Sequence, residues 1–108
     1  MKPNLQGMLK QVQKMQEEME KVQQELGEKV ITEESGGGLV KISMNGKKEV
    51  VDISLEKEII DPNDSSMLED LLIAAFNKAI AAATKMSEEE LGKVTKGMLP
   101  PGMNIPGF

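Results

Sequence analysis

Seven apolar residues recur at alternating steps of three and four near the start of the chain: Leu5, Met8, Val12, Met15, Met19, Val22 and Leu26. Lys, Glu and Gln fill almost every other position in this stretch. The spacing predicts a helix with a narrow apolar seam, and such a seam needs another helix to cover it. The partner can come from the same chain or from a second copy, and the pattern leaves both open.

The following segments predict an α+β fold in one domain spanning residues 1–108. We expect a long N-terminal helix over about residues 4–27, a three-stranded antiparallel meander over about 29–55, a long C-terminal helix over about 66–96 and an extended Pro-rich tail over 97–108. A run of three glycines after Ser35 predicts a hairpin turn, because no Gly-Lys-Ser/Thr follows to make a phosphate cradle. Asn45-Gly46 predicts the second hairpin.

The register of the second hairpin has two candidates. A two-residue turn at Asn45-Gly46 would set Ile42 opposite Glu49. A four-residue loop would set Ile42 opposite Val51. Matching apolar faces favours the longer loop, or a bulge with the same effect.

The second helix carries a broad apolar stripe that suits packing on a sheet or on another helix. Ser87 could begin a separate helix, but no Pro or Gly precedes it, so the sequence favours one continuous helix that ends near Gly97. Four carboxylates lie near the helix start: Asp61, Asp64, Glu69 and Asp70. A metal site is conceivable there, but carboxylates also complement the positive end of a helix, and we expect no metal.

The composition argues against catalysis. The chain has no Cys, His, Tyr, Trp or Arg, so a thiol nucleophile, the commonest general base and the commonest zinc ligand are missing. We therefore expect no enzyme activity, no cofactor and no small-molecule substrate. No apolar run approaches 18 residues and no hydrophobic signal region is visible, which predicts a soluble intracellular protein without a membrane partner.

All 13 basic residues are lysines, and the net charge is −5. A local basic stripe can still bind phosphates, because charges act within a Debye length of about 10 Å. On a helical wheel, three lysines of the first helix cluster roughly 150° from its seam. The candidate DNA-contacting residues are Lys10, Lys14 and Lys21 on the first helix, with Lys78, Lys85, Lys93 and Lys96 on the second. An ordinary solvated helix face explains the same first-helix pattern.

Several stretches are recognisable in combination. They are Glu34-Ser-Gly-Gly-Gly-Leu-Val40, the Asn45-Gly46 hairpin, Met67-Leu-Glu-Asp-Leu-Leu72, Ala74-Ala-Phe-Asn-Lys78 and Leu99-Pro-Pro-Gly-Met103. With the heptad-like first helix, this ordered set resembles the YbaB/EbfC family of bacterial nucleoid-associated proteins over nearly the whole chain. The resemblance implies a tweezer-like homodimer with projecting helical arms that binds double-stranded DNA and associates with the nucleoid in the cytoplasm.

Without arginine, the residues permit Lys-to-phosphate contacts and little reading of base edges. The sequence thus predicts weak, salt-sensitive and mostly sequence-tolerant binding to duplex DNA. A protein-interaction or chaperone-like clamp is the competing interpretation, because helical arms with an acidic surface and nine methionines can also hold a polypeptide.

Overall fold

The computed structural model describes residues 5–98. A long helix α1 (Leu5–Glu28) leads into an antiparallel sheet of three strands, β1 (Val30–Ser35), β2 (Val40–Asn45) and β3 (Val50–Leu55), in the order β1-β2-β3. A short 3-10 helix η1 (Lys57–Ile59) then leads to the second long helix, α2 (Ser65–Met98). The predicted order of helix, meander and helix is confirmed.

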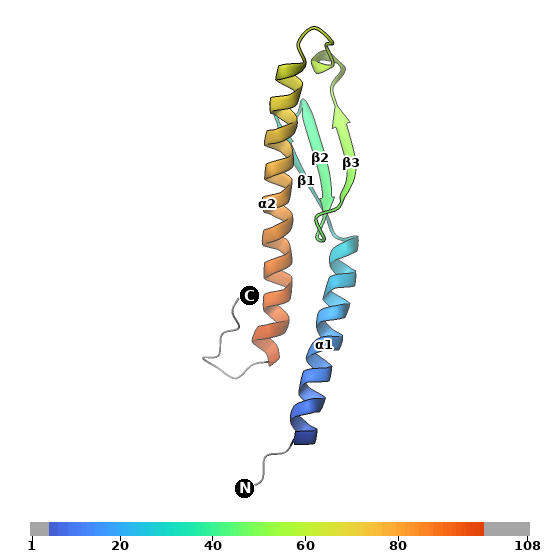
Figure 1. The fold of residues 1–108 in the computed structure, drawn as a ribbon, viewed down its shortest axis with the longest axis vertical. Coiled ribbons are helices and arrows are strands. Elements are labelled where there is room, and N and C mark those ends of the chain that lie inside the picture. Colours follow the sequence, from blue (N-terminus) through green and yellow to red (C-terminus); the bar gives the residue numbers. More distant parts are fainter. Residues whose placement is uncertain (1–4, 99–108) are drawn as a thin grey trace.

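The protein is elongated, with extents of 75 × 23 × 16 Å and a radius of gyration of 20.1 Å. A compact domain of this length would have a radius of gyration of about 13 Å. The excess comes from the two long helices, which project past one end of the sheet as an antiparallel pair (Figure 1). We call this pair, α1 and the last part of α2 from residue 85 onward, the arm.

Both hairpins form, but the predicted register of the second is wrong. Ile42 pairs with Ile53, and Met44 pairs with Val50. The Asn45 N–H donates to the Glu49 carbonyl at 2.9 Å, so the loop closed by this bond has three residues, 46–48, rather than two or four. Its last residue, Lys48, lies in the left-handed region at φ 64°. A three-residue loop of this kind is a common hairpin connection. A register shift next to Ser43 and Met44 then brings the apolar residues of β2 and β3 onto one face, as the bulge alternative anticipated.

The turn between β1 and β2 explains the three glycines. Gly36, Gly37 and Gly38 have φ angles of 63°, 69° and 97°, a region that other residues rarely adopt. The Gly38 N–H donates to the Ser35 carbonyl at 3.3 Å and closes the turn. These glycines therefore serve a tight hairpin and not a phosphate cradle.

The core lies between the inner face of the sheet and one face of α2. Val40 and Ile42 of β2 are fully buried, and so are Ala75, Ala79 and Ala83 of α2. Alanines at four-residue spacing form a smooth helix stripe, which lets the β2 side chains pack closely against the helix axis. Ser35 adds a hydrogen bond between β1 and α2, because its hydroxyl donates to the Leu71 carbonyl at 2.6 Å.

The seam of α1 is only half covered within the protomer. Leu26 is 2% exposed and Met15, Met19 and Val22 are half-buried. Toward the N-terminus, Leu5, Met8, Leu9 and Val12 are 53–67% exposed. The intrachain partner predicted as one alternative is therefore α2, and it covers the C-terminal half of the seam.

The ends of the helices differ slightly from the prediction. α1 continues one residue past Gly27, and α2 runs without a break through Ser87 and Gly92 to Met98. Gly97 and Met98, assigned to the tail by the sequence, are helical because the segment continues the turns of α2. Residues 1–4 and the rest of the predicted tail, residues 99–108, lie outside the described residues.

Candidate nucleic-acid interface

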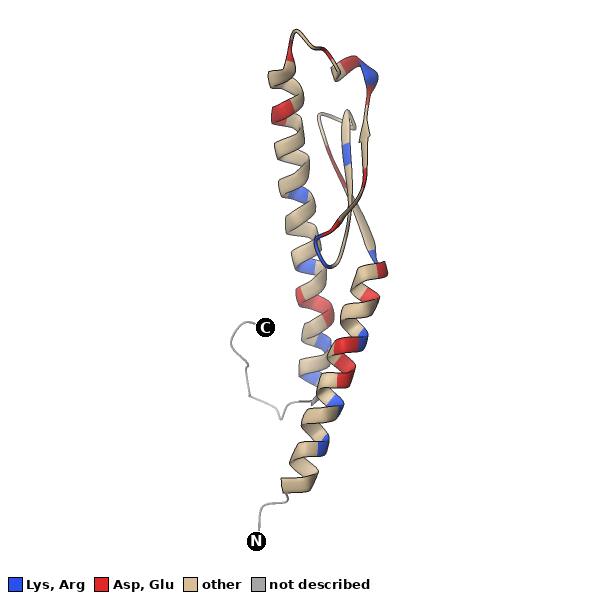
Figure 2. Ribbon diagram, turned by 45° about the vertical axis from the view of Figure 1, so that its right-hand side comes forward, with Lys and Arg blue, Asp and Glu red and all other residues tan. Residues whose placement is uncertain are grey.

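The lysines predicted on the first helix lie on the arm and are all exposed. Residues 5–16 of α1 carry Lys10 and Lys14 and no carboxylate, as Figure 2 shows at the lower end of the helix. Lys21 differs, because Glu17 and Glu25 stand four residues away on either side. The positive charge of α1 is thus concentrated at the tip of the arm, and Lys21 sits in a mixed stretch.

The lysines predicted on the second helix do not act as one group. Lys78 donates to the Glu34 carbonyl at 3.1 Å, so it fastens α2 to β1 beside the sheet. Lys93 pairs with Glu90 at 3.3 Å. Lys85 and Lys96 are exposed, and within residues 5–96 neither forms an ion pair. Lys85, Lys93 and Lys96 therefore lie on the arm, whereas Lys78 lies outside it, beside the sheet.

Glu90 joins the two helices of the arm. Its carboxylate accepts from Lys93 of the same helix and from Lys29 just past the end of α1, at 3.3 and 3.2 Å. These hydrogen bonds, first from Lys29 and then from Lys93, favour the charged carboxylate and lower the pKa of Glu90 below its ordinary value of 4.5. The Lys29–Glu90 ion pair helps to hold the end of α1 near the sheet against α2.

Sequence reasoning missed two further lysines, Lys47 and Lys48, at the tip of the β2–β3 hairpin. The tip is held firmly against the end of α1. The Gly46 N–H donates to the Leu26 carbonyl at 2.8 Å and the Lys29 carbonyl at 3.1 Å. The signal that could have found them is the position of Lys-Lys directly after the Asn45-Gly46 turn, which forces both lysines to the solvent end of the sheet.

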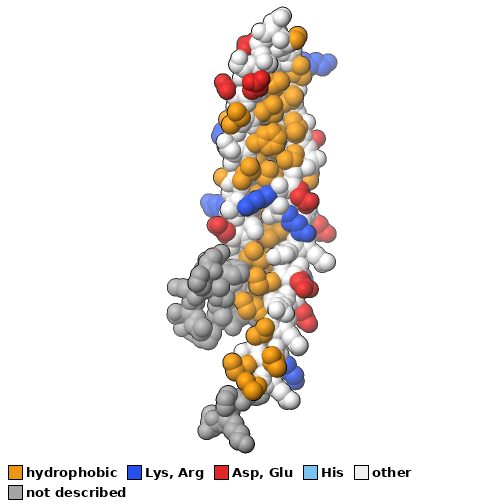
Figure 3. All heavy atoms as spheres, in the orientation of Figure 1, with side chains coloured by type: hydrophobic (Ala, Val, Ile, Leu, Met, Phe, Trp, Pro, Cys, Tyr) orange, Lys and Arg blue, Asp and Glu red, His pale blue; other side chains and the backbone are white. Residues whose placement is uncertain are grey.

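The β3 part of the inner face of the sheet is left uncovered by α2. α2 packs mainly on β1 and β2, so the inner-face residues Val51 and Ile53 of β3 are 52% and 47% exposed. On α2, Ile73 and Ile80 lie on the flank opposite Lys78, the residue that points toward β1, and they are 59% and 43% exposed. Figure 3 shows the resulting hydrophobic surface over the upper half of the molecule. We call these four residues the β3–α2 face.

Of the carboxylates near the start of α2, Asp61 has a local role. Asp61 accepts from the Asn63 N–H at 2.9 Å in the turn before the helix, and no acidic residue stands in the first helical turn. Among residues 5–98, no three His, Cys, Asp or Glu side chains are grouped so that they could hold a metal ion. No helix within that range has the length and hydrophobicity needed to cross a bilayer.

Comparison with known proteins gives a consistent picture. The profile of the YbaB/EbfC DNA-binding family matches residues 1–98. A nucleoid-associated protein of Alkaliphilus metalliredigens is 48% identical over 98% of this chain and 89% of that protein. Another from Alkaliphilus oremlandii is 51% identical over 93% of this chain and 88% of its own length. The crystal structure of an uncharacterized protein from Helicobacter pylori, 26% identical, superposes with a TM-score of 0.62 over 82% of this chain and 98% of that one.

Proposed function

The chain belongs to the YbaB/EbfC DNA-binding family, and from that premise we propose that it binds double-stranded DNA as a homodimer in the bacterial nucleoid. This is a family of DNA-binding proteins and not of enzymes. The proposed contacts run from lysines to phosphates, with little reading of base sequence.

The observation that carries the proposal is the charge at the tip of the arm. Lys10 and Lys14 point away from the apolar seam of α1 in a stretch of twelve residues, 5–16, that holds no carboxylate. A duplex approaching the tip meets positive charge within a Debye length of about 10 Å, although the whole chain has a net charge of −5. Lys96, and Lys85 nearer the sheet, add exposed cations on the second helix.

The homodimer is supported by the exposed β3–α2 face. An apolar sheet face and helix flank of this kind on a small protein indicate an interaction surface. A second copy offers an identical surface, and two-fold pairing of one patch with itself is the commonest way for a chain to close an oligomer. Pairing through this face leaves both arms projecting and available to one duplex, which raises avidity without new contacts.

The chemistry of lysine defines the binding mode. Lysine is a flexible point charge without the planar fork that lets arginine read guanine or insert into a narrow minor groove. Contacts of this kind position a duplex and depend strongly on salt. We therefore expect association with many sequences and a role in organising nucleoid DNA or in gene expression.

The test removes positive charge from the outer face of α1 while keeping the fold. In a variant carrying Lys10→Gln, Lys14→Gln and Lys21→Gln, we expect the slope of log affinity against log salt to lose about 0.9 for each lysine that contacts a phosphate. The control variant carries Lys41→Gln and Lys57→Gln, which remove exposed charges from the sheet and from η1. Unchanged affinity and slope in the arm variant would remove α1 from the proposed interface.

The protein-clamp function predicts a different result. A chain that binds polypeptides through its arm would show no duplex binding even at low salt. Pull-down of a defined polypeptide partner by the arm would then replace DNA in the proposal.

A further inference from the structure

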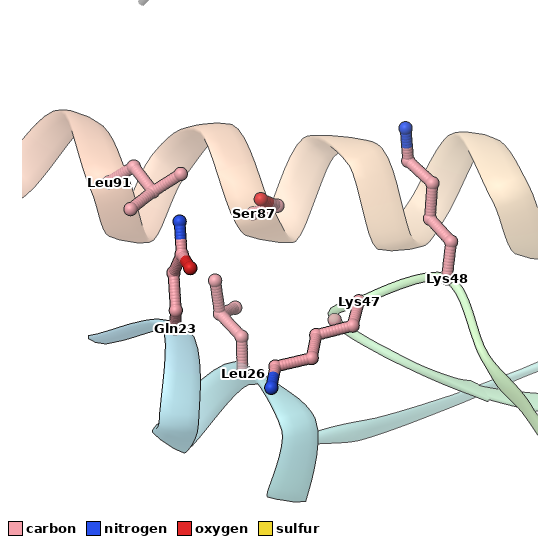
Figure 4. A pocket seen from close by; sticks show the side chains of 7 residues that line it. Gln23, Leu26, Lys47, Lys48, Ser87 and Leu91 are labelled. Carbon is pink, nitrogen blue, oxygen red and sulfur yellow. The ribbon is translucent and has the colours of Figure 1, made fainter. Parts of the chain in front are cut away.

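A hollow of about 430 Å³ lies between the end of α1, the tip of the β2–β3 hairpin and the part of α2 that belongs to the arm (Figure 4). We call it the hairpin hollow, and the residues that line it are Gln23, Leu26, Gly46, Lys47, Lys48, Ser87 and Leu91. The lining has two lysines, one amide and one hydroxyl, and it has no carboxylate. A second hollow on α2 is lined by Glu88 and Glu89 together with Lys93 and Lys96, so it carries both signs of charge. The hairpin hollow is therefore a local positive site on an acidic protein.

The polar groups of the hairpin hollow are free to bind a ligand. Within residues 5–96, no protein group forms a hydrogen bond or ion pair with the ammonium of Lys47 or Lys48 or with the hydroxyl of Ser87. Figure 4 shows Lys48 reaching toward α2 and Lys47 lying across the end of α1. The two ammonium groups thus stand on different sides of the hollow, where they can meet two neighbouring phosphates.

The backbone that carries these lysines is fixed in advance. The Asn45 carboxamide oxygen accepts the N–H groups of Lys47 and Glu49 at 2.9 and 3.0 Å. Its amide nitrogen donates to the Gly27 carbonyl at 3.2 Å and to the Glu49 carboxylate at 2.9 Å. A fixed backbone lowers the entropy lost on binding, because only the side chains must be ordered.

We propose that the hairpin hollow binds two neighbouring phosphate groups of the DNA backbone, one through Lys47 and one through Lys48, with Ser87 and Gln23 as supporting donors. Ammonium, hydroxyl and amide groups are the donors that phosphate oxygens accept in protein–DNA interfaces. The hollow lies where the arm leaves the sheet, so a duplex held along the arm extends the contact to its base (Figure 1). This inference rests on the proposed DNA-binding function and adds a contact that the arm lysines do not supply.

The test compares two variants with the same change of charge. One carries Lys47→Gln and Lys48→Gln, and the other carries Lys41→Gln and Lys57→Gln. Duplex binding is measured by fluorescence anisotropy across a salt series. We expect the hairpin variant to lose up to about 1.8 in salt slope per protomer, at 0.9 for each phosphate contact, and the control to keep the wild-type slope. A further variant, Ser87→Asp, should weaken binding by placing a carboxylate in the hollow.

The outcomes separate the inference from the function on which it rests. Wild-type protein that binds no duplex would overturn both. If wild-type protein binds duplex DNA and the hairpin and control variants have equal salt slopes, only the proposed phosphate site in the hairpin hollow is overturned. A last measurement titrates the protein with inorganic phosphate and follows the amide resonances of Lys48 and Ser87. Saturable shifts of these resonances, with duplex binding unaffected by Lys47→Gln and Lys48→Gln, would assign the hollow to a free anion and refute the DNA contact.

Discussion

Replacing Gly46 by alanine tests how the hairpin tip is joined to the arm. A Cβ atom at residue 46 would lie 2.7 Å from Cδ2, 2.8 Å from Cβ and 2.8 Å from the carbonyl oxygen of Leu26. Carbon atoms at rest are about 3.5–4.0 Å apart. Because Leu26 is buried and one of the three contacts is with its backbone, the overlap is relieved only by moving the hairpin away from α1.

The expected cost follows from two contributions. Overpacking of this kind costs about 1–3 kcal/mol. Separation of the two segments also weakens the hydrogen bond from the Gly46 N–H to the Leu26 carbonyl, which contributes about 1 kcal/mol. We therefore expect Gly46→Ala to lower the free energy of unfolding by about 2–4 kcal/mol.

The assay is urea unfolding followed by far-UV circular dichroism at one protein concentration, since the stability of an oligomer depends on concentration. Gly92→Ala is the matched control, because a Cβ there meets nothing within 4 Å and the residue lies inside α2. The same chemical change should raise stability by about 0.5–1 kcal/mol at residue 92. If Gly46→Ala were as stable as the wild type, the close approach of the hairpin to α1 would be wrong.

Three further predictions concern the hairpin, the dimer and the arm. Asn45→Ala should lower the free energy of unfolding by about 2–3 kcal/mol in the same urea assay, because the buried side chain makes four hydrogen bonds; an unchanged midpoint would contradict this. Ile53→Asp should convert the proposed dimer to monomers in sedimentation velocity, whereas Ser54→Asp on the opposite face of β3 should not; equal behaviour would remove the β3–α2 face from the proposed interface. Since the folded-state pKa of Glu90 is lowered, its stabilising contribution is present above pH 4.5 and is lost as the pH falls through the folded value. Glu90→Gln should therefore unfold with a weaker acid dependence than the wild type, while Glu89→Gln keeps it; identical acid profiles would refute the Lys29–Glu90–Lys93 cluster.

The elements could be predicted because their signals are local. The heptad spacing of α1, the Asn45-Gly46 turn and the unbroken pattern through Ser87 each depend on neighbours a few residues away. The register of β2 and β3 could not be predicted in the same way. It depends on Lys48 adopting a left-handed conformation, which nothing in a lysine favours, and on the loop being held by Asn45 and Leu26.

The candidate site was predicted in part for a related reason. A helical wheel finds lysines on the outer face of one helix, and Lys10 and Lys14 are exposed as expected. It cannot find lysines that a loop brings beside a different helix, and so it misses Lys47 and Lys48. A helical wheel also cannot find a hydrogen-bond partner on another element, such as the Glu34 carbonyl that accepts from Lys78.

Lysine-to-phosphate binding is tested by the affinity of the wild-type protein for a random and an A·T-rich duplex across a salt series. We expect binding to both duplexes to fall steeply as salt rises, with nearly the same slope and little preference between them. Binding that is absent at low salt, or that depends on sequence and hardly on salt, would contradict a lysine-to-phosphate mode of DNA association.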